Sequence, residues 1–333
     1  MRKAFIDSLC TLASKDDRIC LLTADLGYMA LEPFEKRFPN RFLNVGVAEQ
    51  NMIGVATGMA EAGLLPFAYS ISTFAALRPF EFIRNGPVLH RLPVRIVGMG
   101  MGFEYGHAGP THYGIEDVGA LRTMPGLQII IPADGAQTAT ALHATAGSGP
   151  VYYSLGKDDK ASVPGLNGRF EVGKLQIVCP GSSKTALISM GSVSVEAAAA
   201  SYELAQSYGI DTRMAVLSSF NPDPIEDTVN FLEGVTQVIT VEAQTISGGL
   251  GAFVGSVIAM FGLACRLWPI AIRVSPDGTS GSQMDRWKKY GMDRASILQA
   301  VLGLQEPGMT SPDLAALGAV HQPLTSDLVS KKW

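Results

Sequence analysis

Residues 44–54 read Asn-Val-Gly-Val-Ala-Glu-Gln-Asn-Met-Ile-Gly, and Glu49 is the one charged side chain in this largely apolar run. Residues 42–47 predict a buried strand, and residues 52–62 predict a helix that packs tightly on its neighbours. Such a strand-to-helix junction lies at the carboxyl edge of an α/β sheet, where ligands bind. Because a carboxyl group is costly to bury alone, Glu49 should keep its proton or find a partner. The alternative is that Glu49 caps the free N–H groups at the start of the helix.

Short apolar strands and helical segments alternate along the rest of the chain. This alternation predicts an α/β fold with two domains, each a mostly parallel sheet flanked by helices. We expect domains at 1–160 and 173–310, a linker at 161–172 and a loop-rich tail at 311–333. The predicted strands outside the opening segment are 18–24, 64–70, 94–99, 127–131, 151–154, 186–190, 212–217, 237–241 and 270–274.

The composition limits the possible functions. Hydrophobic residues make up 47% of the chain and charged residues only 17%, so a partner subunit or a second copy should cover much of the surface. The net charge of −4 comes without a basic stripe, which predicts no binding to nucleic acid. Residues 248–265 carry no charge, but their five glycines favour a buried helix over a membrane span.

The cysteines and the N-terminus indicate where the protein works. Four cysteines are scattered without a C-x-x-C pair, as expected of small buried side chains in a reducing compartment. Asp7 lies where a signal peptide would need an apolar core. We therefore expect a cytoplasmic protein.

Residues 98–112 form a second unusual segment, Gly-Met-Gly-Met-Gly-Phe-Glu-Tyr-Gly-His-Ala-Gly-Pro-Thr-His. Its five glycines allow the backbone to approach a ligand closely. The segment follows a predicted strand, so it should lie at the same sheet edge as Glu49. His107 and His112 could transfer protons near neutral pH, although a plain loop with solvated histidines has the same composition. A metal site is less expected, because no carboxylate pair accompanies the histidines in sequence.

These two segments together resemble the transketolase family, specifically its pyrimidine-binding and C-terminal domains. G-V-A-E-Q and G-P-T-H at this separation form a specific pair, and the resemblance covers nearly the whole chain in order. The matching residues are 24–27, 42–51, 72–74, 109–112, 116–117, 131–134 and 149–152.

The resemblance implies a coenzyme and a partner. Transketolases use thiamine diphosphate, and full-length members bind the diphosphate and Mg²⁺ through a G-D-G…N motif in an N-terminal domain. This chain contains no G-D-G. It therefore resembles the C-terminal subunit of a split transketolase. The missing N-terminal subunit would carry the diphosphate and Mg²⁺ motif, and self-association would give an α2β2 heterotetramer.

The resemblance also implies roles for particular residues. Glu49 would hydrogen-bond to the coenzyme's aminopyrimidine and favour the tautomer that acts as a base. Phe74 would be the wall on which this ring stacks, and Asp25 would lie near the coenzyme. His112 would contact the substrate and relay protons. A core phenylalanine and a plain helix cap are the alternatives for Phe74 and Asp25. Further candidates for contact with the substrate are His107, Arg78 and Lys157.

Three positions depart from the family pattern. Ala108 replaces an acidic residue before G-x-T-H, Gly100 replaces a histidine, and Ser154 replaces an arginine that grips a substrate phosphate. These replacements predict a substrate that is smaller, unphosphorylated or held differently.

The implied reaction is the transfer of a two-carbon unit from a ketose or related donor to an aldehyde acceptor. One alternative is the beta subunit of a 2-oxoacid dehydrogenase decarboxylase component, which has the same two domains. Another is a non-catalytic scaffold that only stabilises a partner, because a fold alone does not establish an activity.

Overall fold

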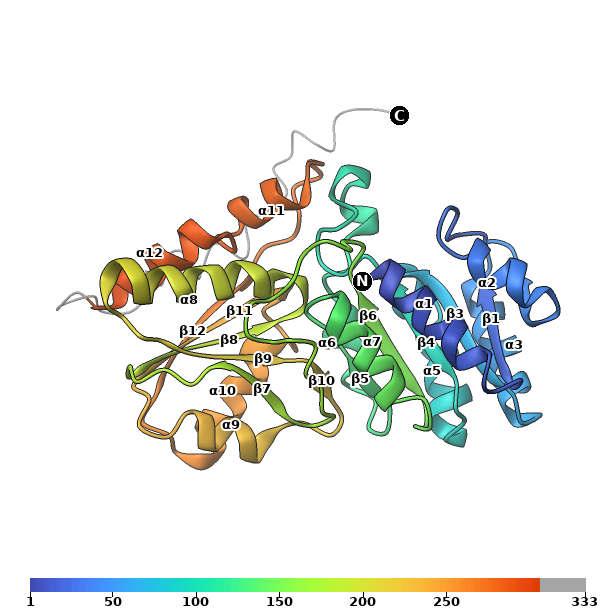
Figure 1. Cartoon of the computed structure of the whole chain (residues 1–333), viewed down its shortest axis with the longest axis horizontal. Coiled ribbons are helices and arrows are strands. Elements are labelled where there is room, and N and C mark those ends of the chain that lie inside the picture. The colour runs from blue at the N-terminus through green and yellow to red at the C-terminus, as the bar shows by residue number, and fades with distance from the viewer. Residues whose placement is uncertain (306–333) are drawn as a thin grey trace, which may run out of the picture.

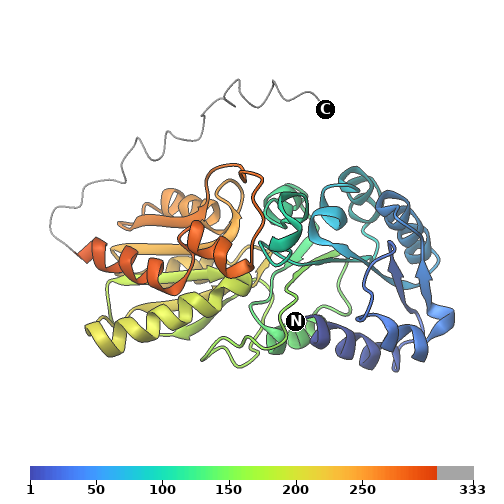
Figure 2. The same ribbon diagram turned by 90° about the horizontal axis from the view of Figure 1, so that it is seen from above.

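The structure, a computed structural model, describes residues 1–305, which form two α/β halves side by side (Figure 1). Figure 2 shows the same halves from above, the first in blue to green and the second in yellow to red. The expected class, two mostly parallel sheets flanked by helices, is confirmed. The last residues of the second expected domain, 306–310, and the expected tail, 311–333, lie outside the described residues.

The first half is built on a seven-stranded sheet with the strand order β10-β5-β6-β4-β3-β1-β2. All neighbours are parallel except β10, which is antiparallel to β5. Runs of Ile, Leu and Val suit strands that are covered on both faces. The strands are β1 (Ile19–Thr23), β2 (Phe42–Asn44), β3 (Leu65–Ile71), β4 (Arg95–Met99), β5 (Gln128–Ile130), β6 (Val151–Leu155) and β10 (Ser219–Phe220).

Helices cover both faces of this sheet. One hydrophobic cluster joins it to α1 (Arg2–Ala13), α2 (Glu32–Arg37) and α7 (Gly135–Ala144). A second cluster joins its other face to α3 (Glu49–Glu61), α4 (Ser72–Ala76), α5 (Phe80–Ile83) and α6 (Asp117–Leu121). Short 3-10 or π turns are η1 (Pro39–Arg41), η2 (Arg84–Val88), η3 (Gly106–Ala108) and η4 (Pro110–His112).

The second half is built on a five-stranded sheet with the order β12-β11-β8-β9-β7, in which β7 is antiparallel to β9. Its strands are β7 (Leu175–Cys179), β8 (Thr185–Met190), β9 (Arg213–Leu217), β11 (Gln237–Thr245) and β12 (Arg266–Ile272). After the turn η5 (Gly191–Val193), one face is covered by α8 (Ser194–Tyr208), α11 (Gln283–Lys289) and α12 (Arg294–Gln305). The other face is covered by α9 (Ile225–Phe231) and α10 (Leu250–Phe261).

The two halves are joined by more than a linker. The short strand β10 lies late in the chain but completes the first sheet. One hydrophobic cluster contains Ile53 of α3 and Leu250 of α10 and runs through both halves. Residues 161–172 contain no helix or strand. The boundaries at 1–160 and 173–310 stay a prediction.

The strand before Glu49 differs from the expected buried strand. β2 ends at Asn44, and Leu43 is 43% and Val47 73% exposed. The reason is the strand order, because β2 is the edge of the sheet and pairs only with β1 among the described residues. An exposed apolar edge of this kind is usually covered by another chain.

Helix α10 lies within the uncharged run 248–265 and begins on a buried carboxylate. Glu242 is fully buried, and its two oxygens accept the backbone N–H groups of Leu250 at 2.7 Å and Gly251 at 2.8 Å. A side chain at Gly249 would collide with this carboxylate, so glycine is needed there. Within residues 1–305, no helix is both long and apolar enough to cross a membrane.

The stability of the chain should therefore depend on pH through Glu242. Burial raises the pKa of this carboxyl to about 7, well above the value of an unfolded chain. The folded state then binds more protons between about pH 4 and pH 7, so the free energy of unfolding should fall as pH rises through this range. The loss from this one group is on the order of 3 kcal/mol, and Glu242→Gln should remove it.

Thermal unfolding followed between pH 4 and pH 8 checks this prediction. The matched control is Glu226→Gln, because Glu226 is exposed on α9. A Glu242→Gln variant that keeps the pH slope of the unmodified chain would contradict the assignment.

Candidate active site

Glu49 is held between two partners at the start of α3. The chain leaves β2, turns at Gly46 with a φ of +74°, and enters the helix at Glu49, whose side chain is 1% exposed. Ser70 Oγ donates to Oε1 at 3.2 Å, and Arg78 Nη1 donates to Oε2 at 2.7 Å. The helix has no side-chain cap, so the alternative in which Glu49 caps its N–H groups is wrong. The buried carboxylate was expected to need a partner, and the structure shows that this partner is Arg78.

Phe74 forms a wall beside this ion pair. It lies in α4 and is only half-buried, so the alternative of a core phenylalanine is wrong. Arg78 Cζ lies 4.4 Å from the centroid of its ring, within the range of a cation–π contact. The ring of His112 is also close to it, with the two ring centroids 5.2 Å apart in an edge-on arrangement. Phe74 therefore contacts both Arg78, the partner of the carboxylate, and the histidine.

The glycine-rich loop extends the cluster beyond His112. Thr111 Oγ1 and His112 Nδ1 are hydrogen-bonded at 2.8 Å, which orients the imidazole. The ring of Tyr105 lies 6.3 Å from that of His112, and Lys157 Nζ lies 4.1 Å from the centroid of the tyrosine ring. Partial burial lowers the pKa of Lys157. A continuous line of contacts thus runs from Glu49 to Lys157.

Tyr105 was not expected from the sequence, although it is the residue that connects Lys157 to the cluster. Gly100 has a φ of +87°, and a side chain there would overlap the Tyr105 ring. A histidine at position 100 could not coexist with this ring position. Next to it, Glu104 accepts a hydrogen bond from the backbone N–H of Lys157, and burial raises the pKa of its carboxyl. The sequence signal that could have pointed to Tyr105 is an aromatic residue within a glycine-rich run.

Asp25 and His107 are not part of this line of contacts. Asp25 is exposed in a left-handed turn after β1, with a φ of +57°. Hydrogen bonds from Asn44 and Tyr28 hold its pKa below the usual value. It caps no helix, so that alternative is wrong. His107 is exposed in η3, at the outside of the loop.

Ser154, which is expected to replace a phosphate-binding arginine of the family, is turned toward a buried carboxylate, and the replacement itself stays a prediction. It is fully buried, and its Oγ donates to Asp117 at 2.8 Å. Tyr152 OH and Gln244 Nε2 also donate to this carboxylate, at 2.7 Å and 2.9 Å, and burial raises the pKa of Asp117. Because Gln244 comes from β11, the group ties the two halves together.

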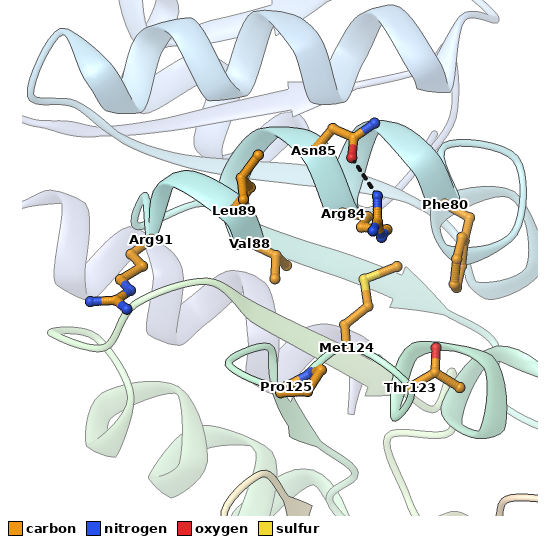
Figure 3. Close-up of a pocket in the computed structure, with 9 residues that line it drawn as sticks. All are labelled: Phe80, Arg84, Asn85, Val88, Leu89, Arg91, Thr123, Met124 and Pro125. Atoms are coloured by element: carbon orange, nitrogen blue, oxygen red, sulfur yellow. Dashed lines mark hydrogen bonds between the residues drawn. The ribbon is translucent and has the colours of Figure 1, made fainter.

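A cavity of about 600 Å³ lies farther along the same segment as Arg78 rather than over Glu49 (Figure 3). Arg84 and Asn85 are hydrogen-bonded at its rim, Val88 points toward Met124, and Arg91 points away. None of the expected site residues lines it. The Glu49 cluster instead reaches solvent at Arg78, whose side chain is 42% exposed.

The arrangement can bind a planar ring that donates hydrogen bonds. The Arg78 guanidinium, itself planar, fits between the Glu49 carboxylate and the Phe74 ring, so a group of that shape and donor character suits the place. His112 lies beside the same Phe74 ring, where it could hold or move a proton of a substrate. No group of three His, Cys, Asp or Glu residues within 1–305 could hold a metal ion.

Comparison with known proteins finds matches in both halves of the chain. Residues 1–159 match the transketolase pyrimidine binding domain, and residues 173–297 match the transketolase C-terminal domain. A subunit of the apulose-4-phosphate transketolase of Phocaeicola vulgatus is 31% identical over 90% of this chain and 96% of its own length. A 6-deoxy-6-sulfo-D-fructose transketolase subunit of Clostridium sp. (strain MSTE9) is 34% identical over 76% of this chain and 78% of its own.

A solved structure shows the same fold. It is a split-gene transketolase described as an inactive beta4 tetramer, with 30% identity and a TM-score of 0.79. The match covers 91% of this chain and 96% of that one. The likeness therefore extends over both sheets rather than over one half alone.

Proposed function

This chain belongs to the transketolase family, as the C-terminal half of a split enzyme, and we propose that its Glu49 cluster activates the coenzyme for transfer of a two-carbon unit. The donor would be a ketose or related compound and the acceptor an aldehyde. One observation carries the proposal: Glu49 is buried next to the half-buried ring of Phe74, and the side chain that contacts both, Arg78, is 42% exposed.

Several residues of this chain have separate proposed roles toward the coenzyme. Thiamine diphosphate, when bound, supplies a nucleophilic carbon and an electron sink for the carbon–carbon bond that breaks. Glu49 would share a proton with the pyrimidine ring, held in orientation by Ser70. Phe74 would stack on that ring. Asp25, which follows the neighbouring strand β1, is a weaker candidate for contact with the coenzyme.

The substrate would approach from the glycine-rich loop. His112 would hold or move a proton of a substrate hydroxyl, because its imidazole lies beside Phe74 and is oriented by Thr111. Lys157 is the cation of this cluster closest to the loop and would face an anionic end of the substrate, a position for which Ser154 is too deeply buried. His107 would contact only a substrate that reaches the outside of the loop. Gly100 and Ala108 still favour a substrate held differently from that of the usual family members.

The partner would supply what these residues do not. The metal and the diphosphate would be held by an N-terminal transketolase subunit with a G-D-G…N motif, and a self-dimer of this chain would give an α2β2 assembly in the cytoplasm. The exposed apolar edge at β2 supports a covering chain.

Reconstitution tests the proposed function. The chain combined with its N-terminal subunit, thiamine diphosphate and Mg²⁺ should transfer a two-carbon unit from a ketose to an aldehyde, as followed by the aldehyde product. Each subunit alone is the control and should be inactive. Decarboxylation of a 2-oxoacid with reduction of a dye would support the dehydrogenase alternative instead. Assembly without any turnover, over a panel of phosphorylated and neutral ketoses, would support the scaffold.

A further inference from the structure

Arg78 makes both contacts that the proposed function assigns to the coenzyme's pyrimidine. Its Nη1 donates to Glu49 Oε2 at 2.7 Å, and its guanidinium carbon lies 4.4 Å from the centroid of Phe74. A guanidinium and an aminopyrimidine are both flat, both offer N–H groups to a carboxylate, and both stack on an aromatic face. A pyrimidine that bound Glu49 Oε2 and stacked on the face of Phe74 that Arg78 covers could not be present together with the guanidinium.

We propose that Arg78 is a stand-in for the pyrimidine: it fills the ring's place in the free chain and has to leave it when the coenzyme binds. This inference rests on the proposed function and adds a residue that positions Glu49 before the coenzyme arrives. Arg78 thereby competes with the coenzyme rather than helping to hold it.

The surroundings of Arg78 suit a side chain that leaves. Its side chain is 42% exposed, whereas Glu49 is 1% exposed, so the arginine reaches the carboxylate from the solvent side. It lies in the short connection between α4, which ends at Ala76, and α5, which begins at Phe80. Because residue 78 lies outside both helices, its guanidinium can rotate into solvent without disturbing helical hydrogen bonds.

The physical reason for a stand-in is the buried charge. A carboxylate at this depth without a partner is strongly unfavourable, and the free chain has no coenzyme to pair with it. Before the coenzyme binds, Arg78 pairs with Glu49. Together with Ser70, it holds the Glu49 carboxylate in its orientation. The arginine's departure has to be repaid from the coenzyme's binding energy, which lowers the apparent affinity of the enzyme for thiamine diphosphate.

The first test measures coenzyme affinity in the reconstituted two-subunit enzyme. Arg78→Met should tighten thiamine diphosphate binding by about five- to tenfold, because the coenzyme no longer has to break a partly exposed ion pair of roughly that strength. Arg78→Lys keeps the charge but loses the flat face, and should tighten binding less. Arg84→Met is the matched control, because Arg84 pairs with Asn85 and does not touch Glu49. Weaker coenzyme binding in Arg78→Met would overturn the proposal, because Arg78 would then be a permanent coenzyme contact.

The second test uses the free chain and needs no activity. Arg78→Met should lower its melting temperature, and Glu49→Gln added to that variant should restore most of the loss. The energetic coupling between the two positions should be present in the free chain and absent from the coenzyme-loaded complex. Coupling that persists in the loaded complex means that the arginine never leaves, and overturns the inference while the proposed function stands. A reconstituted enzyme that binds no thiamine diphosphate at all overturns both.

Discussion

Replacing Glu49 with Gln should lower the turnover of the reconstituted enzyme by roughly 10²- to 10⁴-fold, the usual contribution of a group that moves a proton in the rate-limiting step. The substituted glutamine would occupy nearly the same space and could still accept the hydrogen bond of Ser70, so the fold should survive. What it cannot do is take and return a proton. The loss should therefore fall on kcat far more than on the KM for the sugar substrates.

The matched control for Glu49 lies on the same helix. Glu61 is the last residue of α3 and is exposed, and Glu61→Gln makes the same chemical change away from the cluster. It should leave turnover within about twofold, as most surface substitutions away from a site do. Size-exclusion chromatography of both variants with the partner subunit shows whether assembly is intact. If Glu49→Gln keeps activity within a few-fold while it assembles normally, the proposed coenzyme activation by Glu49 is wrong.

The isolated chain should bind thiamine diphosphate at least about 100-fold more weakly than the two-subunit complex, a difference of roughly 3 kcal/mol. A diphosphate needs cations, a metal ion or aligned N–H groups, and residues 1–305 contain no cluster that could hold a metal. The Glu49 cluster offers a place for the pyrimidine alone. Calorimetry on the chain with and without its N-terminal partner measures the difference.

Thiamine, which lacks the diphosphate, serves as a second ligand in this experiment. The free chain should bind thiamine and thiamine diphosphate with similar weakness, because residues 1–305 contain no cluster that could hold the metal ion of a diphosphate site. Adding the partner subunit should then improve binding of the diphosphate form and leave thiamine almost unchanged. Tight, Mg²⁺-dependent binding of thiamine diphosphate to the isolated chain would contradict the division of the site between two polypeptides.

The local pattern of the sequence was enough to predict the architecture and the centre of the candidate site. Short apolar runs alternating with helical segments gave two mostly parallel sheets, because each element is decided largely by its own neighbours in the chain. Glu49 at a strand-to-helix junction and the Gly-Pro-Thr-His loop after β4 were expected at one sheet edge, and a line of contacts joins them. That expectation followed from the geometry of parallel strands.

Other features depended on which distant segments meet. The edge position of β2 exposed a strand that was expected to be buried, and β10 joined a sheet on the other side of the predicted linker. Ser154 turned out to face Asp117 and not a substrate, since alternate residues of a strand point to opposite faces and the register decides which face is which.

The sequence by itself determined the family, the elements and the identity of the buried acid, because these are written in short runs of residues. Only the tertiary structure decided what Glu49 touches: Ser70 lies 21 and Arg78 29 positions further along the chain. It also decided that Tyr105 links Lys157 to His112. Such pairs form where the strand order and the loop paths bring distant segments together. The packing of the whole core decides which segments meet, and no single run of residues is enough to predict it.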